Sequence, residues 1–99
     1  MTISQATVAT SNASRYLQQL CKHWSHKFEV DFTPYNGKIV FTDGRIVSLE
    51  AKPDALVLRG QAADTEAVKR LEKVVEEHIV RFAFRETLAF DWVPVSAAD

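Results

Sequence analysis

The period of the apolar side chains changes at Phe28, and this change constrains the fold more than any other feature of the chain. Before it, apolar residues recur at helical spacing in the set Leu17, Leu20, Cys21, Trp24 and Phe28. After it, Phe28, Val30 and Phe32 alternate with acidic residues, which is typical of a half-buried strand. The chain therefore combines amphipathic helix with sheet.

Two amphipathic helices are predicted. The first covers residues 12–27 and begins at a Thr-Ser-Asn run, whose side-chain oxygens can accept the free amides of a helix N-terminus. The second covers residues 64–82 and is capped by Asp64. Its apolar face consists of Ala67, Val68, Leu71, Val74, Val75, Ile79 and Phe82.

Strands are predicted over residues 3–9, 28–32, 38–42, 45–51, 55–59 and 88–92, the first as an edge strand and the last ending at Pro94. Asp43-Gly44 is the signal of a two-residue type I′ hairpin. With that turn Val40 lies opposite Val47 on one face, and Ile46 occupies the other. The face with Val40 and Val47 is more apolar than contact with water requires, so we expect a weak homodimer through it.

The predicted order is β-α-β-β-β-β-α-β, an α+β fold. Short turns between four consecutive strands favour an antiparallel sheet, and two amphipathic helices fit a second layer on one of its faces. The order resembles the TATA-box-binding-protein-like topology, which as a likeness of fold implies nothing about DNA binding. We expect one domain over residues 1–99, with frayed ends at about 1–3 and 95–99.

Charge and composition exclude several classes of protein. Twelve basic residues stand against thirteen acidic ones, a balance that argues against nucleic acid as a partner. No apolar stretch is long enough to cross a membrane, and the first residues lack the pattern of a signal peptide. The single cysteine fits a reducing compartment, so we expect a cytoplasmic protein.

Histidines mark the end of the first predicted helix. His23 and His26 are three residues apart, a spacing that allows two metal ligands, but Cys21 points to the apolar face. We therefore expect no bound metal and no cofactor. The plainer alternative is that cationic side chains complement the helix dipole here and that Cys21 packs as a small hydrophobe.

His78 occupies a position in the second helix where an apolar residue is expected. Either it is a core histidine bonded to a backbone carbonyl or to Tyr16, or it faces a ligand in a pocket between the helices and the sheet. Arg81 and Arg85 follow on the adjoining flank. They form either a clamp for a carboxylate or phosphate, or ion pairs within the protein. The candidate ligand-binding residues are thus His23, His26, His78, Arg81 and Arg85.

Residues 13–17, 20–23 and 26–27, together with 78–86 and Trp92, resemble a bacterial family of short proteins catalogued as a domain of unknown function. The resemblance implies a role in iron or siderophore metabolism, because relatives occur alone or with siderophore-interacting flavin reductases. We accordingly expect a binding or accessory module whose partner is an anionic small molecule or such a reductase. A small metal- or haem-binding protein that uses the histidines is the alternative. An enzyme with an unrecognised site ranks third, because no catalytic motif is visible.

Overall fold

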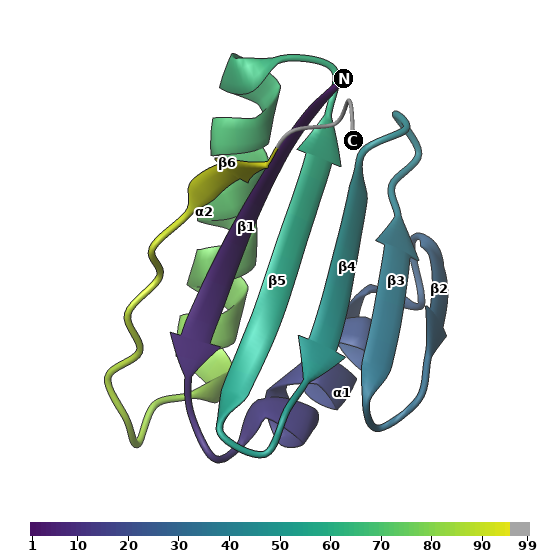
Figure 1. Cartoon of the computed structure of the whole chain (residues 1–99). Helices are drawn as coiled ribbons and strands as arrows, with labels where there is room; N and C mark the ends of the chain where they lie inside the picture. Colours follow the sequence, from purple (N-terminus) through teal and green to yellow (C-terminus); the bar gives the residue numbers. More distant parts are fainter. Residues whose placement is uncertain (96–99) are drawn as a thin grey trace.

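Both helices pack on one face of a six-stranded antiparallel sheet in the computed structural model, which describes residues 1–95 (Figure 1). The elements are β1 (Thr2–Ala9), α1 (Ala13–Trp24), β2 (Glu29–Phe32), β3 (Asn36–Val40), β4 (Ile46–Ala51), β5 (Ala55–Ala62), α2 (Thr65–Phe82) and β6 (Val93–Val95). The strand order is β2-β3-β4-β5-β1-β6. The expected α+β class, element order and placement of the helices are confirmed.

The core lies between the helices and the sheet. Alternate residues of each central strand point to the helices, and Val8, Leu56 and Leu58 are fully buried there. The apolar stripes of the helices meet them with Leu17, Leu20, Leu71, Val75 and Ile79, all without exposed surface. Burying each such side chain contributes roughly 1.5–3 kcal/mol, so this layer supplies most of the stabilisation.

The β3–β4 hairpin differs from its prediction by one residue. Phe41 donates its N–H to the Arg45 carbonyl at 2.8 Å, which leaves a loop of three residues, and only Gly44 has a positive φ, of 91°. This is the three-residue loop with a glycine in the left-handed region. A shift of one residue in the pairing register turns the side chains of the shifted strand to the other face of the sheet. Val47 therefore faces the helices with no exposed surface, and Ile46 pairs with Val40 on the open face. The predicted dimer surface is therefore wrong, since Val40 and Val47 lie on opposite faces.

The two ends of the chain also depart from the prediction. β1 is an interior strand between β5 and β6, and Thr2 and Ile3 are paired with Ala62 and Gln61 rather than frayed. Val95, for which fraying was also expected, is paired with Ile3 in β6. The expectation of fraying at 96–99 lies outside the described residues.

The predicted closing strand over 88–92 is wrong. Its alternation is real, because Leu88, Phe90 and Trp92 pack partly buried against the core. However, pairing with β1 begins only at Val93, and Pro94 lies within β6 at the edge of the sheet, where a missing N–H costs little. The alternation of apolar residues over 88–92 therefore reflects the partial burial of their side chains and not the pairing of a strand.

α1 ends at Trp24, three residues before its predicted end. The N–H groups of Lys27 and Phe28 both donate to the Trp24 carbonyl, and the Ser25 hydroxyl donates to the Lys22 carbonyl at 2.8 Å. These local bonds replace helical ones and turn the chain into β2. At α2 the predicted cap is confirmed, since the Asp64 carboxylate accepts the Ala67 N–H at 2.8 Å.

Candidate functional site

His23 and His78 meet across the contact between α1 and α2. Their ring centroids are 5.0 Å apart, and the rings are inclined at 55°. His23 lies on the flank of α1 that faces α2, and His78 lies on the flank of α2 that faces α1. His23 is exposed and His78 is half-buried. Two candidate residues far apart in sequence thus form one pair.

A hydrogen bond fixes the tautomer of His78. Its Nδ1 lies 2.7 Å from the Val74 carbonyl oxygen, which can only accept, so Nδ1 carries a proton. In the neutral ring Nε2 is then an acceptor, and in the protonated ring it becomes a donor. The backbone carbonyl was one of the two partners expected for this histidine. Tyr16, the other, bonds elsewhere.

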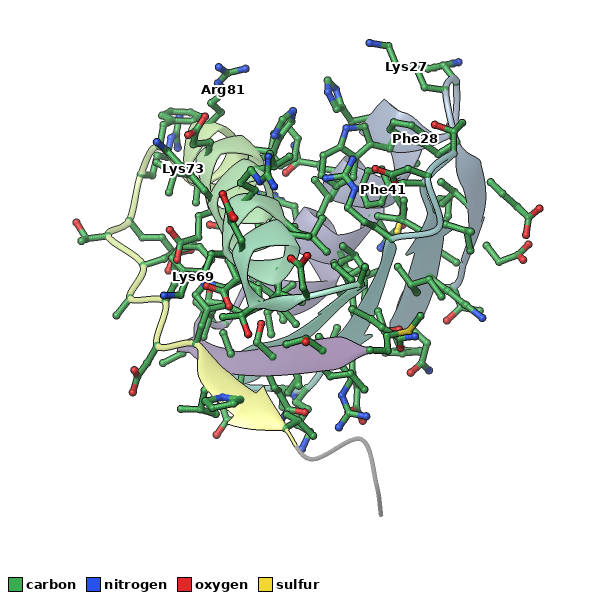
Figure 2. The ribbon with its side chains drawn as sticks, turned by 90° about the horizontal axis from the view of Figure 1, so that it is seen from above. Lys27, Phe28, Phe41, Lys69, Lys73 and Arg81 are labelled. Atoms are coloured by element: carbon green, nitrogen blue, oxygen red, sulfur yellow. The ribbon has the colours of Figure 1, made fainter. Side chains whose placement is uncertain are left out.

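Cationic side chains surround the pair. Burial and then the charges of His78, Lys27, Arg81 and His26, in that order, lower the pKa of His23. We call His23, His26, Lys27, His78 and Arg81 the histidine site. Figure 2 shows Lys27 and Arg81 both projecting from the helix side of the molecule, away from the sheet. Lys69 and Lys73 lie on the other flank of α2, beside the C-terminal segment, and do not join them.

His26 is the outermost member of this set. It is exposed in the turn after α1, and among the charged groups its effect on His23 is the weakest. Because α1 ends at Trp24, the three-residue spacing of His23 and His26 is not helical. The spacing argument for two metal ligands on one helix turn is therefore wrong.

Aromatic rings form the base of the histidine site. The His78 ring lies 4.8 Å from Trp24, and the His23 ring lies 6.2 Å from Phe82, centroid to centroid. Trp24 in turn contacts Phe41 at 5.2 Å, and Phe41 lies against Phe28, as Figure 2 shows. Such rings pack against the imidazoles and hold them in place.

The arginines do not form the ion pairs that were the alternative explanation for them. Within residues 1–95, the ion pairs of the arginines are Arg45 with Asp43 and Arg70 with Glu66. Arg81 and Arg85 have none there. The chain also has no acidic residue before Glu29, so α1 offers its cations no local partner.

Arg85 lies apart from the histidine site. The prediction placed Arg85 on the flank of the second helix. Because α2 ends at Phe82, Arg85 lies instead in the turn that follows. It borders a cavity of about 460 Å³ at the start of α1. We call this the arginine cavity, and it is lined by Asn12, Arg15, Tyr16, Phe82, Phe84, Arg85 and Glu86.

Glu86 is the acidic residue that lines this cavity, and its carboxylate accepts hydrogen bonds from uncharged side chains. Thr10 Oγ1 donates to the carboxylate at 3.1 Å, Asn12 Nδ2 donates at 2.9 Å, and the Tyr16 hydroxyl donates as well. The bonds from Tyr16 and Asn12 are the main causes that hold the pKa of Glu86 below its usual value. Burial and this carboxylate raise the pKa of Tyr16. Glu86 thus ties the turn after α2 to the start of α1.

Neither a reactive thiol nor a cluster of metal ligands accompanies these features. Cys21 is buried, and burial raises the pKa of its thiol to about 11, so it is no thiolate at neutral pH. In the part of the chain that the structure describes, three or more His, Cys, Asp or Glu side chains do not come together as a metal site. Over the same residues no helix is long and apolar enough to cross a membrane.

A second cavity, of about 740 Å³, lies on the open face of the sheet. Its charged side chains have both signs, Lys38 and Arg59 beside Asp31 and Glu50, and Arg59 already donates to Gln5 at 2.8 Å. None of the predicted site residues lines it. His78 lines neither this cavity nor the arginine cavity.

Sequence reasoning missed several residues of the two sites. Lys27 could have been found, because it shares the His23 flank of the helix predicted over residues 12–27. Arg15, Tyr16 and Glu86 could not, because their meeting depends on how the turn after α2 packs against α1. The absence of acidic residues before Glu29 was the available signal for a cationic surface on α1.

Comparison with known proteins gives a family and a fold. The model of the family described as "Uncharacterized protein conserved in bacteria (DUF2218)" matches residues 5–93. The NMR structure of PA4090 from Pseudomonas aeruginosa is similar, with a TM-score of 0.79 and 39% sequence identity, over 94% of this chain and 96% of that one. No curated protein matches the chain.

Proposed function

The chain belongs to this uncharacterized bacterial family, and we propose that it is a module that binds a small anionic molecule at the histidine site. The observation that carries the proposal is the convergence of His23, His78 and Arg81 with no acidic partner in residues 1–95. Lys27 and Arg81 bring positive charge to the site that no ion pair within residues 1–95 neutralises, and this charge attracts an anion.

The chemistry of the site suits a carboxylate or a catecholate. A guanidinium group binds such oxygens with two parallel hydrogen bonds, and a protonated imidazole adds a donor. His78 has its Nε2 available for this role, because Nδ1 is already bonded to Val74. The rings of Trp24 and Phe82 offer apolar surface to the rest of the ligand.

Binding without covalent chemistry is the form of activity that these features favour. The one thiol of the chain is buried and protonated, so it does not serve as a nucleophile. Among small anions, we propose a siderophore that carries carboxylate or catecholate groups. Support for this finer proposal is its chemical match to the site, together with the sequence resemblance described above.

We test the proposal with His78→Leu, which keeps a side chain of similar size and removes the imidazole. Benzoate and a ferric catecholate siderophore are titrated into ¹⁵N-labelled protein. We expect both probes to shift the signals of the His23 and His78 rings and of the Trp24 indole. His78→Leu should weaken binding by about 1–3 kcal/mol, the value of a hydrogen bond to a charged group.

The matched control is Lys73→Gln, which removes an exposed cation on the far flank of α2. It should leave binding unchanged. Equal affinity in wild type and His78→Leu, or the absence of shifts at either histidine, would refute the proposed site. Shifts with benzoate but none with the ferric siderophore would support the anion site and refute the siderophore as its ligand.

A further inference from the structure

The arginine cavity has a net positive charge, because two guanidinium groups and one carboxylate line it. Arg15 and Arg85 line it from α1 and from the turn after α2, and within the described residues neither forms an ion pair. Glu86 lies in the same cavity, yet its oxygens accept from Thr10, Asn12 and Tyr16 instead. Two guanidinium groups therefore remain available at a hollow of about 460 Å³.

Aromatic surface accompanies these charges. Phe84 is 77% exposed at the cavity, and the Arg85 guanidinium lies 5.3 Å from the centre of its ring. A ligand that covers this ring removes apolar surface from water, which favours binding. The stacked guanidinium is also restricted in its motion, so less entropy is lost when it binds a carboxylate.

The cavity adjoins the histidine site. Phe82 belongs to both, since it lines the cavity and its ring lies 6.2 Å from that of His23. Tyr16 and His23 lie on the same flank of α1, seven residues apart. At a rise of 1.5 Å per residue, this places the two sites about 10 Å apart along the helix.

We propose that the arginine cavity is a second anion subsite, and that the ligand is an elongated molecule with two anionic groups joined by an apolar or aromatic segment. One group binds at His23, His78 and Arg81, the segment lies over Phe82, and the other group binds between Arg15 and Arg85. This inference rests on the proposed function, because it takes the histidine site as the first subsite.

The test compares carboxylates that differ in length and charge. Sebacate has two carboxylates at nearly the required spacing, glutarate has two that are too close, and octanoate has one. When both ends bind at once, the second binding event is intramolecular, so sebacate should bind at least about tenfold more tightly than octanoate or glutarate. Titration of ¹⁵N-labelled protein gives the affinities and shows which side chains respond.

Arg85→Gln and Arg15→Gln test the second subsite. Both side chains are exposed, so the variants should keep the wild-type amide spectrum. In each variant the ratio of sebacate to octanoate affinity should fall to about one. Lys73→Gln is the charge control and should keep the wild-type ratio.

The outcomes separate the inference from the proposed function. If octanoate shifts the His23 and His78 signals but sebacate binds no more tightly, the second subsite is refuted and the histidine site stands. The same follows if sebacate binds tightly in both arginine variants. If no carboxylate shifts the histidine signals, the proposed function fails, and the two-subsite ligand fails with it.

Discussion

At the scale of single residues, the state of His23 governs how the proposed site responds to pH. Burial and the neighbouring cations lower the pKa of His23 from its usual 6.5, so at neutral pH the free protein has an uncharged imidazole there. A bound anion favours the protonated form and raises the pKa again. Binding of benzoate should therefore take up a proton and become tighter as the pH falls from 8 to 6, by less than about tenfold per pH unit.

The free protein should respond in the opposite direction. The pKa of His23 is lower in the folded than in the unfolded chain, so the unfolded chain binds more protons below pH 6.5. The stability of the fold therefore decreases as the pH is lowered in that range. His23→Gln should reduce both pH dependences. A benzoate affinity that is constant from pH 8 to 6 in wild type would contradict this account.

Glu86 gives a second prediction at this scale. Its pKa is lowered in the folded chain by its hydrogen bonds, mainly that from Tyr16, so its contribution is complete above pH 4.5 and is lost as the pH falls through the lowered value. Tyr16→Phe should cost about 1 kcal/mol at pH 7, the net value of a typical hydrogen bond, and less at pH 3. Urea unfolding at both pH values measures the difference. The exposed Tyr35, changed to Phe, should show no such loss.

At the scale of elements, hydrophobic period predicted the helices and most strands, because each buries one face in a single core. It failed where local chemistry admits two answers. Asp43-Gly44 suits a two-residue turn and a three-residue loop alike, and the structure adopts the latter, with only Gly44 at positive φ. At 88–92 the alternation was correct, but alternation measures burial and not hydrogen bonding. The end of α1 depended on Ser25, whose hydroxyl bonds a helix carbonyl.

The contact between α1 and β3 gives a prediction at the element scale. A Cβ added at Gly37 would lie 2.8 Å from the Cys21 sulfur, and both residues are buried. Gly37→Ala should therefore cost about 1–3 kcal/mol through overpacking. Cys21→Ala removes the sulfur, so the double variant should be more stable than the sum of the two single losses predicts.

Gly60→Ala is the comparison for this cycle. There the added Cβ would meet the end of the Leu71 side chain at 3.3 Å, and the loss should be smaller. The urea midpoints of wild type, Gly37→Ala, Cys21→Ala and the double variant measure these losses, and the midpoint of Gly60→Ala gives the comparison. Additive losses in the double variant would show that the sulfur is not what excludes a side chain at Gly37.

At the scale of the whole molecule, only part of the candidate site could be predicted from the sequence. Helical phase correctly placed His23 on one flank of α1, and the unusual position of His78 was visible in the apolar stripe of α2. That these two flanks face each other is a property of how the helices pack on the sheet. The same holds for Glu86, which bonds to Thr10 from 76 positions away. No local pattern contains that information.

The last prediction tests which face of the sheet is the core. In the structure Val47 is fully buried under the helices, whereas its neighbour Ile46 is half-buried on the open face. Val47→Lys would place a charge in the core and should cost about 4 kcal/mol or more, enough to unfold much of a small domain. Ile46→Lys keeps its charge in water and should cost about 1 kcal/mol. A two-residue turn at Asp43-Gly44 would exchange these outcomes, because it places Ile46 in the core, so the two urea midpoints distinguish the registers.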